Sequence, residues 1–314
     1  MTRLGDLASG GKVALARALT DLEARAESAA VADLLDEAFR APKGAVLGLT
    51  GPPGVGKSTL IDALITAFRQ RGKTLGIIAI DPSSRRSRGA LLGDRTRFRI
   101  DPDDTGVFVR SMAARDRLGG VADVTLPAAV LMRALYDIVI VETVGVGQSE
   151  YSIVDQADLV VFCAQPGSGD ALQFMKAGVM EVPDLILVTK GDMEALARRT
   201  ESDLRGALSL VAGGGAAADV LRCSANDGSG IDEVVDWLVH KSAALGATAR
   251  ARHLHQARVW AEGHLIDRFG REGLSALRNQ GERRSETAPF REFADSLAAI
   301  RSKIVDVFRS HTQI

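Results

Sequence analysis

The distribution of apolar residues changes along the chain from a helical spacing to short continuous runs. From Lys12 to Phe39, apolar residues recur at intervals of three and four, which predicts a pair of amphipathic helices. The segment APKG (41–44) ends this pattern, and short apolar runs follow, most of them separated by amphipathic stretches long enough for a helix. Runs without polar interruption are typical of strands buried on both faces. They are AVLGLT (45–50), LGIIAI (75–80), GVFV (106–109), DIVIVE (137–142), DLVVFCA (158–164), DLILVT (184–189) and DVLRCS (219–224).

The alternation of strands and helices predicts an α/β fold of three layers, with helices on both faces of a parallel sheet. Right-handed crossovers bring the carboxyl ends of such strands to one edge, where ligands bind. The helix IDEVVDWLVHKSAAL (231–245) ends this core, and residues 249–314 show only a charged helical pattern. This tail is a helical appendage or oligomerisation arm, or else a solvated extension. We expect an N-terminal helical segment in 1–43, a core in 44–246 and a C-terminal helical arm in 247–314.

The stretch GPPGVGKST (51–59) directly follows the first apolar run. It has the spacing G-x-x-x-x-G-K-S of a phosphate-binding loop between a strand and a helix. Its glycines leave room for backbone N–H groups to surround phosphate oxygens, and the helix N-terminus adds its positive dipole. Lys57 is expected to reach the β- and γ-phosphates, and the hydroxyl of Ser58 to bind Mg²⁺. The predicted phosphate-site residues of this P-loop NTPase are Gly51, Gly54, Val55, Gly56, Lys57, Ser58 and Thr59.

A second motif, TKGD (189–192), favours guanine over adenine. The carboxylate of Asp192 can accept hydrogen bonds from both the ring N–H and the exocyclic amine of guanine, whereas adenine presents no such pair of donors. The segment CSAND (223–227) resembles the loop whose backbone N–H meets the guanine oxygen. Thr189 stands where Asn is more common, and we expect this change to cost a contact with the base or with the phosphate loop. The predicted guanine-site residues are Lys190, whose stem lies over the base, Asp192, Ser224 and Ala225.

Carboxylates follow two further strand runs at the same edge of the sheet. Asp81 comes after LGIIAI and Glu142 ends DIVIVE, and both are expected to hold Mg²⁺ directly or through water. Asp94 is a third candidate for metal or water positioning, and Gly145 would let a backbone N–H approach the γ-phosphate. Each carboxylate has an alternative role as a helix cap or as a partner of arginine. The predicted metal ligands are Ser58, Asp81, Asp94 and Glu142, and the predicted catalytic residues are Lys57, Asp94 and Glu142.

Residues 85–99 contain six arginines and are locally basic. Three interpretations compete: a switch segment that holds a catalytic arginine, the lid of a small-molecule kinase, or a solvated face. The position of the segment after the second strand favours the switch. Gln148 and Gln165 are the nearest candidates for orienting the attacking water, and neither is placed securely. We therefore expect slow intrinsic hydrolysis.

Composition and charge narrow the range of partners. The 314 residues carry 39 Lys and Arg against 40 Asp and Glu, so no overall positive field attracts nucleic acid or an anionic membrane. The chain shows neither a signal-peptide pattern nor an uninterrupted apolar stretch of about 18 residues. We expect a soluble cytoplasmic protein with no nucleic acid and no membrane partner. Cys163 and Cys223 lie in apolar runs and are predicted to be buried thiols.

Several motifs taken together are more specific than the phosphate loop alone. GPPGVGKSTLIDAL, IAIDPSS, GALLGDR, VETVGVGQSE and QPGSGDALQFMKAG resemble the MeaB/ArgK family of GTPases, associated with methylmalonyl-CoA mutase, and the resemblance covers nearly the whole chain. It implies a P-loop GTPase whose C-terminal helical arm makes a homodimer. It also implies a chaperone that binds GTP and GDP with Mg²⁺ and associates with adenosylcobalamin-dependent methylmalonyl-CoA mutase. Such a chaperone gates cofactor loading and protects or reactivates the mutase.

The resemblance also assigns roles to residues. Lys57, Asp81, Asp94 and Glu142 match positions placed around Mg²⁺ and phosphate in the family. The segment 166–177 matches a third switch that signals to the client protein. Its PGSGD sequence predicts a flexible segment, and it is followed by apolar side chains suited to an adaptable contact.

Two other functions remain as alternatives. A small-molecule kinase, the older interpretation attached to the ArgK name, is supported by the arginines of 85–99, but the guanine motif argues against it. A metallochaperone GTPase for another client would show a tract rich in His or Cys, and the chain has only five histidines. His253 and His255 lie on different faces of the predicted helix, which disfavours a metal site there.

Overall fold

The fold is built on one parallel β-sheet. The computed structural model describes residues 2–82, 98–114, 124–143, 153–167, 183–211, 218–278 and 285–311. The seven strands of the sheet follow the order β3-β2-β4-β1-β5-β6-β7, and every neighbouring pair is parallel. Each of the predicted apolar runs overlaps one strand, with β2 and β3 extending past the ends of theirs, so the predicted α/β sheet is confirmed. The strands are β1 (Ala45–Thr50), β2 (Leu75–Pro82), β3 (Val107–Ala114), β4 (Ile138–Glu142), β5 (Leu159–Ala164), β6 (Leu185–Val188) and β7 (Asp219–Arg222).

The strands are apolar throughout because both of their faces are buried. Successive side chains of a strand point to opposite faces of the sheet. In β1, Leu47 and Leu49 belong to a buried cluster on one face, and Val46 belongs to a separate cluster on the other. This arrangement explains why the sequence shows uninterrupted runs rather than alternation of apolar and polar residues.

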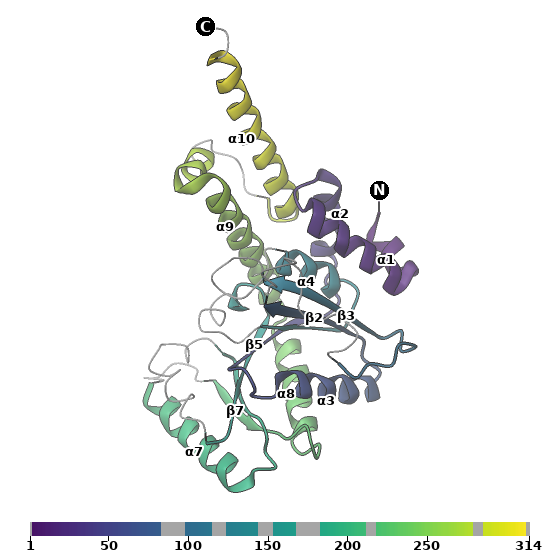
Figure 1. Ribbon diagram of the computed structural model, residues 1–314, viewed down its shortest axis with the longest axis vertical. Coiled ribbons are helices and arrows are strands. Elements are labelled where there is room, and N and C mark those ends of the chain that lie inside the picture. Colours follow the sequence, from purple (N-terminus) through teal and green to yellow (C-terminus); the bar gives the residue numbers. More distant parts are fainter. Residues whose placement is uncertain are drawn as a thin grey trace.

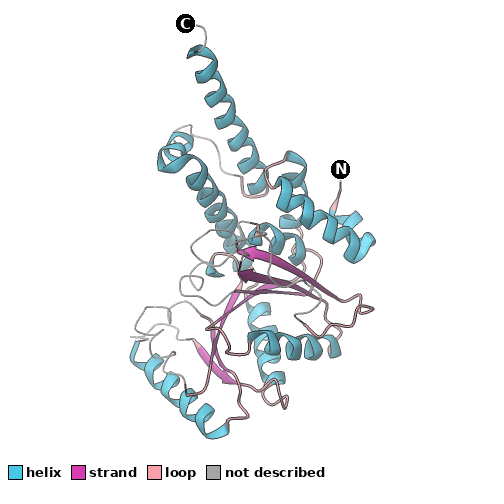
Figure 2. Ribbon diagram, viewed as in Figure 1, coloured by secondary structure: helices cyan, strands magenta, loops and turns pink. Residues whose placement is uncertain are grey.

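Helices cover both faces of the sheet and complete the three layers (Figures 1 and 2). Helices α3 and α8 share one buried cluster with the central strands, whereas α1, α2, α4 and α9 share the cluster on the opposite face. Helix α7 packs in a third cluster with β5, β6 and β7. The helices are α1 (Leu4–Arg25), α2 (Ala29–Arg40), α3 (Lys57–Gln70), α4 (Thr125–Arg133), α7 (Glu194–Val211), α8 (Ile231–Ala244), α9 (Thr248–Arg278) and α10 (Pro289–His311).

The N-terminal helix pair is longer than the periodicity predicts. Helix α1 begins at Leu4 rather than near Lys12, and it contains a break at Gly11, which has φ 60° and ψ −151°. The break explains the difference, because the two halves of α1 do not share one continuous helical register. Helix α2 begins after Ser28, whose side chain accepts a hydrogen bond from the backbone N–H of Val31 at 3.3 Å.

The C-terminal helices start against the body of the protein, and α10 then extends away from it (Figure 1). The buried carboxylate of Asp36 accepts hydrogen bonds from the backbone N–H groups of Phe290 and Arg291, at 3.0 and 2.9 Å. Trp260 of α9 packs on the rings of Phe290 and Phe293. The first turns of α10 are therefore anchored on α2 and α9. In the described ranges, no helix is long and apolar enough to cross a membrane.

A buried polar network fastens α9 to the sheet at the amino ends of the strands. Asp158, which is 1% exposed, accepts a hydrogen bond from the Val46 backbone N–H at 2.8 Å. Its other oxygen lies 2.8 Å from Nε2 of His253, and Arg133 Nη1 lies 3.6 Å from the carboxylate. Although burial raises the pKa of Asp158, the His253 hydrogen bond and the Arg133 charge hold it below its usual value. His253 thus has a structural role in the buried interior.

Candidate functional site

The phosphate loop lies at the centre of the sheet's carboxyl edge. Strand β1 lies between β4 and β5, so the strand order reverses around it, which is where α/β sheets bind ligands. Gly51, Gly54 and Gly56 have φ values of 137°, 75° and 99°, a region that other residues enter at a cost. A Cβ on Gly51 would also lie 2.4 Å from the carbonyl oxygen of Cys163. The loop can keep this shape only with glycine at these positions.

The side chain of Lys57 folds back into the loop. Its Nζ donates to the carbonyl oxygen of Gly51 at 2.7 Å and to that of Pro52 at 3.2 Å, and the residue is only 7% exposed. An ammonium held by neutral carbonyls gains more from a phosphate oxygen, because charge-assisted hydrogen bonds are stronger. The loop therefore holds its cation at the place where the sequence predicts phosphate.

Two of the four predicted metal ligands meet at the end of β4. The hydroxyl of Ser58 donates to Oε1 of Glu142 at 3.0 Å, and Glu142 is 1% exposed. Glu142 pairs in register with Leu49 of β1 and Ala79 of β2, so Asp81 lies two residues further along the neighbouring strand. Hydroxyl and carboxylate oxygens are the donors that Mg²⁺ prefers, and these residues fit such an ion. Within the described residues, no three His, Cys, Asp or Glu side chains form a metal cluster on their own.

The guanine motif is joined directly to the phosphate loop. The hydroxyl of Thr189 donates to the carbonyl oxygen of Val55 at 2.8 Å and lies 3.1 Å from that of Ala164. The side chain of Thr189, although shorter than that of asparagine, thus still reaches the backbone of the phosphate loop, and of the two contacts expected to be lost only the one with the base remains open. Nζ of Lys190 donates to the carbonyl oxygen of Gly54 at 3.0 Å.

Gln165 lies on the base side of the site rather than at the phosphate end. Its Oε1 accepts a hydrogen bond from Nζ of Lys190 at 2.9 Å. This contact ties the end of β5 to the guanine motif. A glutamine engaged there is poorly placed to orient a water molecule at the γ-phosphate.

The carboxylate of Asp192 is exposed and bonded by two neighbours. Ser224 Oγ donates to Oδ1 at 2.9 Å, and the side-chain amide of Asn226 donates to Oδ2 at 3.3 Å. The Ser224 bond, helped by the backbone and by Asn226, holds the pKa of Asp192 below its usual value. Asp192 is therefore ionised at neutral pH, as an acceptor of two base N–H groups must be.

A cavity of about 140 Å³ joins these parts. Phosphate loop, TKGD motif and CSAND loop all contribute to its walls, so the structure brings together motifs that are far apart in the sequence. A larger cavity, of about 850 Å³, lies between α1 and β3 and contains none of the predicted site residues. Residues that line the smaller cavity include Val55, Thr59, Thr189, Lys190, Asp192, Ala225 and Asn226.

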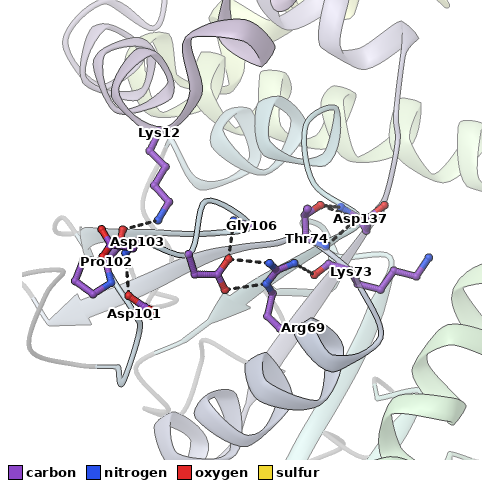
Figure 3. A network of polar contacts seen from close by, with 10 residues as sticks. Lys12, Arg69, Lys73, Thr74, Asp101, Pro102, Asp103, Gly106 and Asp137 are labelled. Carbon is purple, nitrogen blue, oxygen red and sulfur yellow. Dashed lines mark hydrogen bonds and ion pairs between the residues drawn. The ribbon is translucent and has the colours of Figure 1, made fainter.

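The far end of α3 is tied to the segment before β3 (Figure 3). Arg69 makes two hydrogen bonds to Asp104, from Nε and Nη2, each of 2.8 Å. The backbone N–H of Arg99 donates to Asp62 of α3 at 2.9 Å. A Cβ on Gly106 would lie 2.4 Å from the Arg69 guanidinium carbon, so a larger residue there would displace the Arg69 side chain. Helix α3 thus links the phosphate loop to residues 98–106, a connection that local sequence pattern does not reveal.

Several predicted residues lie outside the described residues. These are Asp94, Gly145, Gln148, most of the basic stretch 85–99 and all but the first two residues of 166–177; for Asp81 the backbone is described but not the side chain. The sequence did not predict three contacts: that of Gln165 with Lys190, that of Asn226 with Asp192 and that of Arg69 with Asp104. The contact of Asn226 could have been anticipated from the CSAND segment, because Asn226 follows Ser224 and Ala225, which were predicted to lie at the guanine site.

The chain matches known proteins over most of its length. The family model described as methylmalonyl-CoA mutase-associated GTPase MeaB matches residues 15–272. A relative from Caulobacter vibrioides, named as a GTPase, is 38% identical over 277 residues, which is 84% of this chain and 83% of the relative. The mitochondrial methylmalonic aciduria type A homolog of Mus musculus is 40% identical over 222 residues, covering 68% of this chain and 53% of the relative.

Other relatives match over a shorter part. A relative from Pyrococcus abyssi, also named as a GTPase, is 50% identical over 166 residues, or 52% of this chain and 51% of the relative. The chain thus spans about half the length of the archaeal and mouse relatives that it matches. A crystal structure of an LAO/AO transport system kinase aligns with a TM-score of 0.63 and 28% identity, covering 94% of this chain and 96% of the other.

Proposed function

Because the chain belongs to the family of methylmalonyl-CoA mutase-associated GTPases of the MeaB type, we propose that it binds GTP at the carboxyl edge of its sheet and hydrolyses it to GDP and phosphate. The observation that carries this proposal is the meeting of the phosphate loop and the guanine motif at one cavity. Thr189 links the two, since its hydroxyl bonds the carbonyl oxygen of Val55. A base held at Asp192 thereby lies beside the loop that holds its phosphates.

In this proposal, each site residue that the structure describes has a part in binding or hydrolysis. The backbone N–H groups of the phosphate loop and Nζ of Lys57 hold the phosphate oxygens and offset the negative charge that develops on them. Ser58 and Glu142 would hold Mg²⁺, which when bound neutralises charge on the phosphates. Asp81, Asp94 and Gly145 remain part of the proposal on sequence grounds alone.

We propose slow intrinsic hydrolysis that a partner accelerates. Gln165 is bonded to Lys190 on the base side, which leaves Gln148 or a partner residue to orient the attacking water. GTPases that lack a well-placed glutamine or arginine turn over slowly until a partner supplies the missing group.

The proposed partner is adenosylcobalamin-dependent methylmalonyl-CoA mutase, because the family is described by its association with that enzyme. In this proposal, the nucleotide state gates the loading of adenosylcobalamin and protects or reactivates the mutase, with 166–177 as the segment that signals to it. The chain would act as a cytoplasmic homodimer joined through the arm 247–314. The projection of α10 from the body supports a dimerisation role, since its outer turns extend to where a second copy of the chain can reach them (Figure 1).

A single experiment tests the activity and the partner. GTP hydrolysis is measured with the purified chain alone and with excess methylmalonyl-CoA mutase, and the released inorganic phosphate is quantified. Slow release that the mutase accelerates supports both parts of the proposal. Release that the mutase leaves unchanged contradicts the client assignment. Transfer of phosphate to a small molecule, with no free phosphate, contradicts GTP hydrolysis and favours the kinase alternative.

A further inference from the structure

The guanine-reading carboxylate already has hydrogen-bond donors within the protein. Oδ1 of Asp192 accepts from Ser224 and Oδ2 accepts from the side-chain amide of Asn226. Guanine offers the same kind of donors, a ring N–H and an exocyclic amine, and must reach the same two oxygens. The neighbours of Asp192 therefore either support the incoming base or compete with it.

The two neighbours approach the carboxylate from different sides. Ser224 is fully buried, so its hydroxyl reaches Asp192 from the protein interior. Asn226 is exposed and lines the cavity that also contains Val55, Lys190 and Ala225. The amide of Asn226 thus comes to Asp192 from the side on which the base enters.

We propose that Asn226 is an internal competitor of guanine: its side-chain amide occupies Asp192 and must leave when the base binds. The inference rests on the proposed role of Asp192 in reading guanine. Asn226 then lowers the affinity of the site for guanine nucleotides and speeds the release of GDP. Ser224 acts in the opposite direction, because its hydroxyl fixes the carboxylate without blocking the cavity.

The turn that carries Asn226 holds its shape without the Asn226 side chain. Ser224 N–H donates to the carbonyl oxygen of Ser229 at 2.8 Å, and Gly228 N–H donates to that of Ser224 at 3.0 Å. Ser229 N–H also donates to the Asp227 carboxylate at 2.9 Å. Removal of the Asn226 amide leaves all three bonds in place, so Asn226→Ala is expected to fold normally.

The test is the affinity of Asn226→Ala for GDP and ADP, measured by titration and by displacement of a fluorescent nucleotide. Loss of one competing hydrogen bond to an exposed carboxylate is expected to tighten GDP binding about fivefold, mainly through slower release. Binding of ADP is expected to stay unchanged, because adenine has no donor pair for Asp192. A change in overall loop structure would alter both nucleotides together.

Two further variants make the result specific. Ser224→Ala is the matched control and is expected to weaken GDP binding. In Asp192→Ala, the added change Asn226→Ala is expected to have no effect on GDP, because the contested acceptor is gone.

The failure of this inference differs from the failure of its premise. Asp192→Asn is expected to shift preference from GDP to xanthosine diphosphate; if it does not, the role of Asp192 in base recognition is wrong and the inference falls with it. If that shift occurs but Asn226→Ala leaves GDP affinity unchanged or weaker, Asn226 is no competitor and only the present inference is overturned.

Discussion

The two edges of the sheet use similar polar groups in opposite ways. At the amino edge, Asp158 is buried and bonded to Val46, His253 and Arg133, all of them fixed parts of the protein. At the carboxyl edge, Lys57 donates to backbone carbonyls of its own loop and Asp192 is bonded by exposed Asn226. A ligand can replace the partners of Lys57 and Asp192 at the carboxyl edge, but it cannot replace the buried partners of Asp158. Contacts that are complete and buried stabilise the fold, whereas contacts with replaceable partners keep a binding site ready.

The largest expected effect comes from the buried edge. Asp158→Ala leaves the Arg133 guanidinium without its counter-charge at 2% exposure, and we expect the free energy of unfolding to fall by about 3–5 kcal/mol. Urea denaturation measures this loss. Asp184→Ala is the matched control, because Asp184 likewise accepts from a strand N–H, that of Val160 at 2.8 Å, but is half-buried. Its expected cost is about 1 kcal/mol, and equal losses in both variants would contradict the special role of Asp158.

At the nucleotide edge, Lys57→Ala should separate binding from stability. We expect GTP affinity to fall about 100-fold, because a charge-assisted contact to phosphate is lost. The free energy of unfolding should change by less than about 1 kcal/mol, since the hydrogen bonds from Lys57 to Gly51 and Pro52 lie within its own loop. Nucleotide titration and urea denaturation give the two values. Lys43→Ala, at the opposite edge, serves as control, and a matching loss of affinity there would contradict the division between the edges.

A buried carboxylate that is hydrogen-bonded to backbone N–H groups provides a pH test. Burial, only partly offset by the N–H groups of Phe290 and Arg291, raises the pKa of Asp36 from 3.8 to about 6. The folded state then holds this proton more tightly than the unfolded state. The resulting stabilisation is complete below pH 4 and is lost as pH rises towards 6, by about 2 kcal/mol.

The measurement compares the free energy of unfolding of the natural chain with that of Asp36→Asn between pH 4 and 7. The difference in free energy of unfolding between the two proteins should change between pH 4 and about 6 and stay constant above that pH. A difference that does not vary with pH would show that Asp36 has an ordinary pKa in the folded protein.

The smallest expected effect concerns the link between base and phosphate recognition. Thr189→Val removes the hydroxyl that donates to Val55, and we expect losses of about 1 kcal/mol in stability and about fivefold in GTP affinity. Thr189→Ser keeps the hydroxyl and should retain most of both. Normal GTP binding by the valine variant would mean that the link does not shape the loop.

Local sequence patterns were sufficient to predict the strands of the sheet and the main motifs of the candidate site. Continuous apolar runs predicted the strands because both faces of the sheet are covered, and the glycine spacing predicted the loop because its backbone requires positive φ at Gly51, Gly54 and Gly56. The motifs TKGD and CSAND predicted which residues gather at the cavity, since carboxyl ends of parallel strands share one edge.

Contacts between distant residues were not predictable in the same way. The bonds of Asp158 to His253 and of Arg69 to Asp104 depend on how helices settle against the sheet, which no local period records. The contact of Asn226 with Asp192 is set by a turn held by its own hydrogen bonds. Helix α1 was underestimated because the break at Gly11 divides its apolar pattern.

The hydroxyl of Thr189 couples the binding of the base to the binding of the phosphates. Because Thr189 joins the base-reading segment to Val55, a phosphate group that orders the loop also settles the base site. Guanosine and pyrophosphate offered together as separate molecules should therefore bind with positive cooperativity. In ligand-design terms, inhibitors that span both subsites should gain affinity beyond the combined contributions of their halves.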